Sequence, residues 1–151
     1  MVAMIGRAWR VAAVCAALSF PAAAPAQTAG LAQPREAADI FVAATAAGDA
    51  ARIAALYAPD ALMVAPGAPP INGREAIAAV FRRNFAAGRN AIAFSRINAD
   101  IGADRAAIYW EWRAEVGPTA KIAGRSLVYF RKYPEGWLIS ADMMHIERAP
   151  Q

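Results

Sequence analysis

Apolar and polar residues alternate along this chain with two different periods. From residue 34 to about residue 88, apolar side chains recur at the three- and four-residue spacing of an amphipathic helix. After about residue 90 they recur at every second position, as in a half-buried strand. The pattern predicts helices first and an antiparallel sheet afterwards, which is typical of the α+β class with its helices on one face of the sheet.

Two helices are predicted at the start of this region. The helix over 34–47 has an apolar stripe made of Ala38, Phe41, Val42 and Thr45. Gly48 follows it and can end it in a left-handed conformation. Asp49 then caps a second, shorter helix over 49–57, because its carboxylate can accept hydrogen bonds from the free N–H groups of the first turn.

A short strand and a third helix follow. The apolar segment 60–65 is predicted to be a strand, and it runs into PGAPP, whose prolines exclude regular structure. A helix over 74–87 comes next, ended by Gly88. Its apolar stripe consists of Ile77, Val80, Phe81 and Phe85.

Four strands are predicted in the second half, over 91–100, 105–115, 121–132 and 137–146. The segments between them have the composition and length of hairpin turns, so consecutive strands should pair antiparallel. The strand over 105–115 has one wholly apolar face, formed by Ile108, Trp110, Trp112 and Ala114.

The first 26 residues have the three zones of a secretory signal peptide. A basic start is followed by an apolar run over 11–20 and by small residues that end in the motif Ala24 to Ala26. The apolar run is about half the roughly 20 residues that a membrane-spanning helix needs. Cleavage after Ala26 yields a chain that starts at Gln27, so the sequence predicts a periplasmic or secreted protein without a membrane anchor.

Behind the signal peptide (1–26) we expect a flexible N-terminus over 27–33 and one domain over 34–148. The one cysteine, Cys15, lies in the leader, so the mature domain has no thiol for a disulfide, a nucleophile or a zinc ligand. Val14 before it disfavours a lipoprotein. The leader also carries two arginines, so its removal lowers the formal net charge of +4 by two. The remaining basic residues are scattered, which argues against a nucleic-acid partner.

Two stretches of the chain resemble the nuclear-transport-factor-2-like superfamily. FVAATAAGDAARIAALYAPDALMVAPGAPPINGREAI is similar to the first half of such domains, especially in the SnoaL-like and ketosteroid-isomerase-like branches. GRSLVYFRKYPEGWLISADMMHI is similar to their last two strands, in which Gly136 and Trp137 open the final strand and Asp142 follows five residues later. The resemblance covers nearly all of the predicted domain.

The resemblance implies a cystatin-like cone, in which three N-terminal helices pack on a strongly curved antiparallel sheet and enclose a cavity. It further implies a small apolar ligand in that cavity and a homodimer formed through the outer face of the sheet. Ketosteroid isomerase chemistry would require a carboxylate base, a hydroxyl donor and a second acid. Those positions fall at Ala65, Phe41 and 126–128, which lack these groups, so the sequence argues against that activity.

Asp142 is the first candidate catalytic residue. It follows the apolar run 137–139, where an ionised carboxylate is costly unless it is paired or faces water. In one interpretation it faces the cavity with a raised pKa and takes part in acid–base chemistry. In the other it forms a structural salt bridge with an arginine such as Arg113 or Arg125.

His145 is the second candidate, because histidine has the ordinary pKa nearest to neutral pH. Asp142 and His145 together would form a general acid and base pair. Strict alternation places positions 142 and 145 on opposite faces of the strand, so both reach one cavity only if a bulge intervenes. The other interpretation is a histidine on the surface or in a dimer interface.

Aromatic and sulfur-containing side chains are the candidates for lining the cavity and binding a ligand. The residues expected there are Tyr57, Met63, Trp110, Trp112, Tyr129 and Met144. No metal site is expected, because one histidine and dispersed carboxylates lack ligand spacing. No cofactor is expected, because the sequence contains no glycine-rich phosphate loop, nucleophile elbow or dinucleotide motif.

The sequence therefore favours an exported small-molecule-binding domain with an apolar cavity. One form of this hypothesis is a cofactor-free isomerase, cyclase or hydrolase centred on Asp142. The alternative is a non-catalytic binding or dimeric assembly module of the same fold. The sequence leaves open whether any reaction is catalysed.

Overall fold

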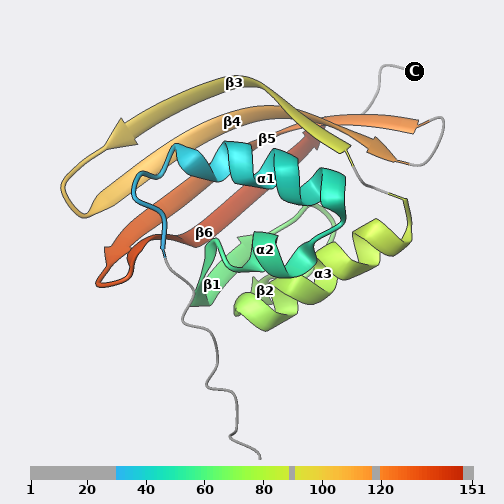
Figure 1. Ribbon diagram of the computed structural model, residues 1–151. Helices are drawn as coiled ribbons and strands as arrows, with labels where there is room; N and C mark the ends of the chain where they lie inside the picture. The colour runs from blue at the N-terminus through green and yellow to red at the C-terminus, as the bar shows by residue number, and fades with distance from the viewer. Residues whose placement is uncertain (1–29, 89–90, 117–119, 148–151) are drawn as a thin grey trace, which may run out of the picture.

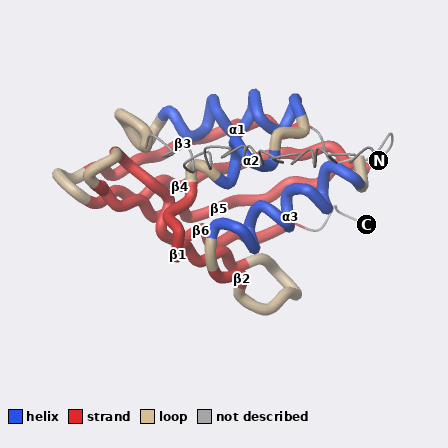
Figure 2. Tube along the Cα trace, turned by 60° about the horizontal axis from the view of Figure 1, so that its bottom comes forward, coloured by secondary structure: helices blue, strands red, loops and turns tan. Residues whose placement is uncertain are grey.

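The computed structural model describes residues 30–88, 91–116 and 120–147, and the predicted leader over 1–26 lies outside them. The helices and strands of this part are α1 (Glu36–Ala47), α2 (Ala50–Ala54), β1 (Tyr57–Val64), β2 (Ile71–Asn72), α3 (Arg74–Ala86), β3 (Ala91–Ile101), β4 (Arg105–Val116), β5 (Ala120–Tyr133) and β6 (Gly136–Glu147). The helices lie on one side of a curled sheet (Figures 1 and 2), so the predicted α+β class is confirmed.

The sheet has the strand order β2-β1-β6-β5-β4-β3. The four strands β3 to β6 pair antiparallel in sequence order, as predicted, and each begins and ends within one residue of its predicted bounds. β1 instead lies parallel to β6, and β2 pairs with the outer side of β1. The last strand of the chain is therefore an interior strand of the sheet.

The turn between α1 and α2 follows the predicted capping pattern. Gly48 takes a left-handed conformation with φ of 65°, and the Oδ1 atom of Asp49 accepts a hydrogen bond from the backbone N of Arg52 at 2.9 Å. α2 ends at Ala54, short of the predicted residue 57. The chain pairs with the sheet from this point, because the backbone N of Ile139 donates a hydrogen bond of 2.8 Å to the carbonyl oxygen of Leu56.

The buried stripe of α1 differs by one position from the prediction. Val42 is 40% exposed, and the buried residues of the helix are Ala37, Ala38, Phe41, Ala44 and Thr45. α1 lies against β3 and α3 lies against β1, so the two helices cover opposite ends of the concave sheet face. The core lies between them, with Phe130, Ile108 and Ile139 fully buried.

The described part of the predicted flexible N-terminus, residues 30–33, is bound to the sheet. The backbone of Leu31 exchanges two hydrogen bonds with that of Trp137, at 3.0 and 2.9 Å, and the Leu31 side chain is buried. Gly30 and Gly136 cross so closely here that a Cβ on either would lie within 2.7 Å of the other's backbone. Residues 30 and 31 are thus held against the start of β6 by backbone hydrogen bonds.

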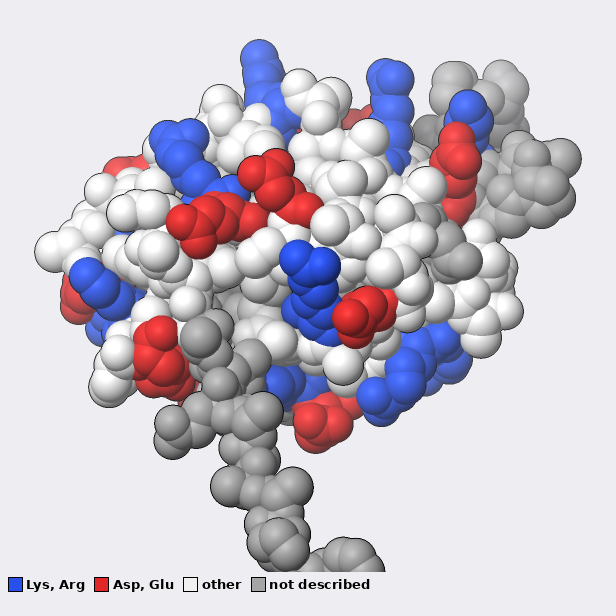
Figure 3. All heavy atoms as spheres, in the orientation of Figure 1, with Lys and Arg blue, Asp and Glu red and all other residues white. Residues whose placement is uncertain are grey.

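The helix-bearing face of the molecule carries interspersed charges. Basic and acidic side chains alternate there with uncharged ones and do not gather in one patch (Figure 3). None of the helices in the described residues has the length and apolar character needed to cross a membrane.

Candidate functional site

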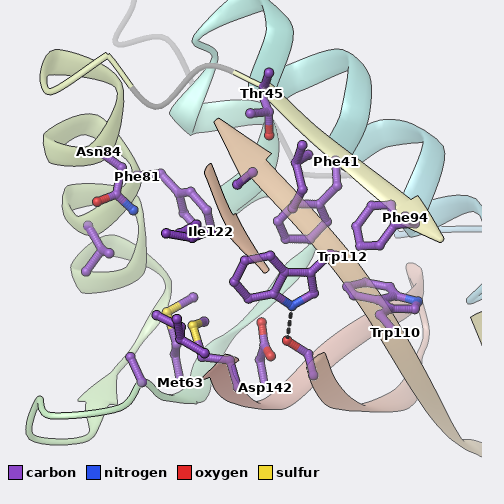
Figure 4. Close-up of a pocket in the computed structure, with 18 of the residues that line it drawn as sticks. Phe41, Thr45, Met63, Phe81, Asn84, Phe94, Trp110, Trp112, Ile122 and Asp142 are labelled. Carbon is purple, nitrogen blue, oxygen red and sulfur yellow. Dashed lines mark hydrogen bonds between the residues drawn. The ribbon is translucent and has the colours of Figure 1, made fainter. Parts of the chain in front are cut away.

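A cavity of about 270 Å³ lies between the concave face of the sheet and helices α1 and α3. The sheet supplies its floor and the helices its opposite wall (Figure 4). Its residues are Phe41, Thr45, Met63, Ala65, Val80, Phe81, Asn84, Phe85, Ala91, Ile92, Phe94, Trp110, Trp112, Ala114, Ile122, Ser126, Asp142, Met144 and Ile146. Among these lining residues Asp142 is the one with an ionisable side chain, and six carry aromatic rings.

Asp142 lies at the floor of the cavity and is 5% exposed. Its side chain points from β6 towards the indole of Trp112 (Figure 4). The hydroxyl of Tyr57 donates a hydrogen bond of 2.8 Å to its Oδ2 atom. The other oxygen, Oδ1, is buried without a hydrogen-bond partner in the described part of the chain. A buried polar atom left in this state calls for a functional or structural explanation.

A β-bulge in β6 turns Asp142 towards the cavity. Ile139 pairs with Phe130, whereas Ala141 pairs with Tyr129, so Ser140 is an extra residue without a partner of its own in β5. The extra residue shifts the alternation by one. Ile139 and Asp142 therefore face the same side, although they are three residues apart.

Burial sets the charge behaviour of Asp142. Desolvation raises the pKa of its carboxyl from 3.8 to about 6, although the hydrogen bond from Tyr57 opposes this rise. The Ser126 hydroxyl also lowers the pKa of Asp142, as the Tyr57 hydroxyl does. It is not positioned to form a hydrogen bond with Oδ1 of Asp142. Burial and the neighbouring Asp142 raise the pKa of Tyr57 well above its ordinary value, so this phenol stays protonated.

Trp112 reaches across the floor because its neighbour in β5 has no side chain. It pairs with Gly124, and a Cβ there would overlap the indole ring and lie 2.6 Å from the carbonyl oxygen of His145. The Nε1 atom of Trp112 donates to the Oγ of Ser126 at 3.2 Å, the dashed line in Figure 4. The serine hydroxyl therefore keeps its own proton free to donate towards the floor of the cavity.

The structure brings together five of the residues predicted from sequence. Asp142, Met63, Trp110, Trp112 and Met144 all line the cavity. Tyr57 lies behind the cavity wall, where it is fully buried and holds Asp142.

Two of the predicted residues lie outside the cavity. Tyr129 is 37% exposed and does not belong to the cavity lining, because it alternates with the inward Val128 and Phe130. His145 is exposed on the outer face, in a shallow groove with Arg125 and Leu127. The bulge precedes Asp142 instead of separating it from His145, so the two residues face opposite sides as strict alternation requires.

The predicted salt bridge to Asp142 is absent from the described residues. Arg125 pairs instead with Glu147, on the outer face. Arg113 is exposed on the strand next to it. The interaction that holds Asp142 is the hydroxyl of Tyr57, so the carboxylate has no neutralising partner among the ion pairs of this part of the chain.

Sequence reasoning missed the contribution of Ser126, Phe94 and Asn84 to the cavity. Ser126 alternates with the buried Val128 and Phe130 on β5, so the strand periodicity contained the signal for its inward position. Asn84 lies one helical turn beyond Phe81 and shares its face of α3. In the described segments, no cluster of three or more His, Cys, Asp or Glu side chains could hold a metal ion.

Several solved structures share this architecture. An NTF2-like protein with a cystatin-like fold from Novosphingobium aromaticivorans is 22% identical over 73% of this chain and 77% of its own, with a TM-score of 0.64. A ketosteroid isomerase-like protein from Erwinia carotovora atroseptica is 20% identical over 76% and 94%, with a TM-score of 0.63. At these identities the likeness establishes the fold.

A third structure has a somewhat higher identity. It comes from Thiobacillus denitrificans, is named for the calcium/calmodulin-dependent protein kinase type II association domain, and is 27% identical over 77% of this chain and 96% of its own, with a TM-score of 0.65. No curated protein matches the chain. The sequence model of the SnoaL-like domain matches residues 38–136, which is more than half of the chain. The chain therefore belongs to the SnoaL-like domain family and has the cystatin-like fold of NTF2-like proteins.

Proposed function

We propose that this protein binds a small, mostly apolar molecule in the cavity and transfers a proton to or from it through Asp142, without a cofactor. The observation that carries the proposal is the buried carboxyl at the cavity floor, with a pKa of about 6 and one unpartnered oxygen. Isomerases, cyclases and hydrolases that work without cofactors can use such a group as a general acid or base.

The size of the cavity limits the ligand. A volume of about 270 Å³ corresponds to roughly nine water molecules at about 30 Å³ each. A molecule with one or two rings therefore fits. The walls offer mainly aromatic and aliphatic carbon, so the ligand gains most of its affinity from apolar burial and its orientation from Asp142.

A pKa of about 6 allows Asp142 to act in both directions near neutral pH. At pH 7 most molecules carry the carboxylate, which accepts a proton, and a minority carry the acid, which donates one. Tyr57 holds the carboxyl in place through Oδ2. Oδ1, which has no partner among the described residues, is the atom assigned to the ligand.

The first experiment is a thermal-shift screen of the mature chain, from Gln27, against small cyclic ketones, alcohols and amines. A ligand that binds only the folded state raises its stability, by about 2.7 kcal/mol at a concentration of 100 Kd. Each hit is then incubated with the protein in D2O, and exchange of ligand C–H for C–D is followed by NMR.

Two variants of the same strand give a matched comparison. Asp142→Asn keeps the shape of the side chain and removes the titrating proton, so exchange should stop while the cavity remains. His145→Gln lies on the outer face and should leave both binding and exchange unchanged. If ligands bind and no exchange occurs even in the wild type, the proton-transfer function is wrong and a binding module remains. If His145→Gln abolishes exchange, the assignment to Asp142 alone is wrong.

The outer face of the sheet supports the second candidate function, assembly with a second copy of the chain. Leu127 and Met143 lie side by side there and are 55% and 61% exposed. Around them Arg96 pairs with Glu111, so the charges on this rim neutralise each other and do not repel an identical face. The similar structure from Thiobacillus denitrificans, which is named for an association domain, also supports this candidate function.

Sedimentation equilibrium tests the assembly. We expect a dimer for the wild type and a monomer for Leu127→Asp. Val42→Asp, on exposed α1, serves as the control and should stay dimeric. A monomeric wild type at micromolar concentration would exclude this function.

Export is also part of the proposal, and it rests on the three zones of residues 1–26. Expression of the full chain in a bacterial host, followed by fractionation and N-terminal sequencing, tests it. The expected product is periplasmic and begins at Gln27. A cytoplasmic product that keeps Met1 would contradict export.

A further inference from the structure

We propose that the cavity selects positively charged ligands, and that its natural ligand carries a protonated amine which pairs with Asp142 while its apolar body lies against the aromatic wall. This inference rests on the proposed function, because it names the chemical class of the ligand in the same cavity. It follows from three features of the cavity: its charge, its aromatic rings and the unpartnered oxygen.

The charge of the lining is one-sided. Among the described residues of the lining, those from α1, α3, β1, β3, β4 and β5 have no ionisable side chain, and β6 contributes Asp142. Arg74 is not a lining residue of the cavity, and its Nε atom donates a hydrogen bond of 2.6 Å to the carbonyl oxygen of Tyr57. An anionic ligand would therefore meet a carboxylate and no cation among the described lining residues, whereas a cationic ligand would neutralise a buried charge.

The aromatic rings extend in a connected series across the cavity from α3 to β3. Phe85, Phe81, Phe41, Trp110 and Phe94 follow one another with ring centroids 5.0 to 6.2 Å apart. Ring faces carry negative electrostatic potential, and a cation within about 6 Å of a face is attracted to it. Such a wall tolerates any apolar ligand, but it favours a charged amine over a neutral or anionic group.

Oδ1 of Asp142 sets the polar contact. A carboxylate oxygen can only accept a hydrogen bond, so its partner must be a donor, and an ammonium is the strongest donor for it. The groups that face this carboxyl are the phenol of Tyr57 from β1 and the hydroxyl of Ser126 from β5, and neither is charged. The same arrangement would stabilise positive charge that develops on a substrate during proton transfer, so it agrees with the proposed role of Asp142.

Isothermal titration with three single-ring probes of similar size tests the inference. Benzylamine is cationic, benzyl alcohol is neutral and benzoate is anionic at pH 7.5. For the wild type we expect benzylamine to bind at least roughly tenfold more tightly than benzyl alcohol, as a charged hydrogen bond implies, and benzoate not to bind. The preference for benzylamine should fall between pH 7.5 and pH 4.5 as Asp142 takes up its proton, because the ammonium stays charged throughout.

Two variants locate the selectivity. Asp142→Asn should remove the preference for benzylamine over benzyl alcohol and the pH dependence of that preference. Phe81→Leu keeps most of the apolar volume and removes one aromatic ring. It should therefore lower the affinity for benzylamine roughly two- to fivefold more than the affinity for benzyl alcohol. Both variants are checked for folding by circular dichroism and by thermal unfolding.

Three results would overturn the inference. The first is equal or tighter binding of benzyl alcohol by the wild type, which leaves the proposed function intact. The second is a preference for benzylamine that survives in Asp142→Asn. The third is binding of neither these probes nor any compound of the larger panel, in which case the proposed function fails as well.

Discussion

The two faces of strands β4 to β6 are made from alternate residues of the same segments, yet they have opposite chemistry. On the concave face, Asp142 is buried among aromatic rings with a raised pKa and no opposite charge among the residues described. On the convex face, Arg125 and Glu147 form an ion pair in contact with solvent. Position relative to water, and not nearness in sequence, decides which carboxyl is available for chemistry.

The largest difference between the faces should appear when neighbouring aromatic residues of β5 are truncated. Phe130 is fully buried on the concave face and Tyr129 is 37% exposed on the convex face. Phe130→Ala should lower the free energy of unfolding by about 3–5 kcal/mol, because it leaves a cavity in the core. Tyr129→Ala should cost less than about 1 kcal/mol. Urea unfolding measures both, and similar losses would show that the convex face is not solvent-exposed.

The next effect concerns the proton on Asp142. Since burial raises its pKa from 3.8 to about 6, the folded state binds this proton more tightly than the unfolded state. The resulting stabilisation is complete below about pH 3.8 and is lost as the pH rises through about 6, a change of about 3 kcal/mol.

Unfolding of wild type and Asp142→Asn between pH 4 and pH 8 checks this prediction. The stability of the wild type relative to the variant should fall by that amount as the pH rises, and the shared titrating groups cancel in the difference. A difference that does not change with pH would mean that Asp142 is not buried as a titrating group.

A smaller effect on stability is expected at Gly124, where the Trp112 indole occupies the space that a side chain would fill. Gly124→Ala should cost about 1–3 kcal/mol, because the new methyl group overlaps the Trp112 indole. It should also weaken ligand binding, since the ring would be displaced from Ser126. Gly102→Ala is the control, because its Cβ would lie 3.3 Å from the nearest atom, a carbonyl oxygen. Equal losses for the two variants would argue against a special role for Gly124.

The smallest effect should come from the charges of the convex face. Arg96 and Glu111 approach to 3.5 Å, with side chains 61% and 38% exposed. A double-mutant cycle with Arg96→Gln and Glu111→Gln should give a coupling below about 1 kcal/mol that disappears at high salt. A larger coupling that persists in salt would show that this rim is shielded from solvent, as in a dimer interface.

Much of the fold was accessible from sequence because it depends on local signals. The four hairpin strands, the left-handed Gly48 and the Asp49 cap follow from the periods and turn residues of their own segments. The end of α2 and the start of β1 at Tyr57 could not be predicted in this way. Tyr57 pairs with β6, about 80 residues further along the chain, and this pairing overrides the local helical preference.

The candidate site was only partly predictable for the same reason. Alternation indicated that Trp110 and Trp112 share a face, and both line the cavity. The contact between Tyr57 and Asp142 spans 85 residues, and no spacing rule connects them. The bulge at Ser140 also leaves no clear mark in the sequence, although it decides which residues of β6 face inward.

That single bulge has an evolutionary consequence. If β6 ran as a regular strand with Ser140 paired to Tyr129, every later residue would change sides, so Met143 and His145 would point inward and Asp142 outward. The bulge therefore keeps a carboxylate, and not an imidazole, on the cavity side of the strand, whereas deletion of Ser140 itself would make the strand regular and leave Asp142 inward. Within such a family, new acid–base chemistry can arise by the gain or loss of a bulge as readily as by substitution.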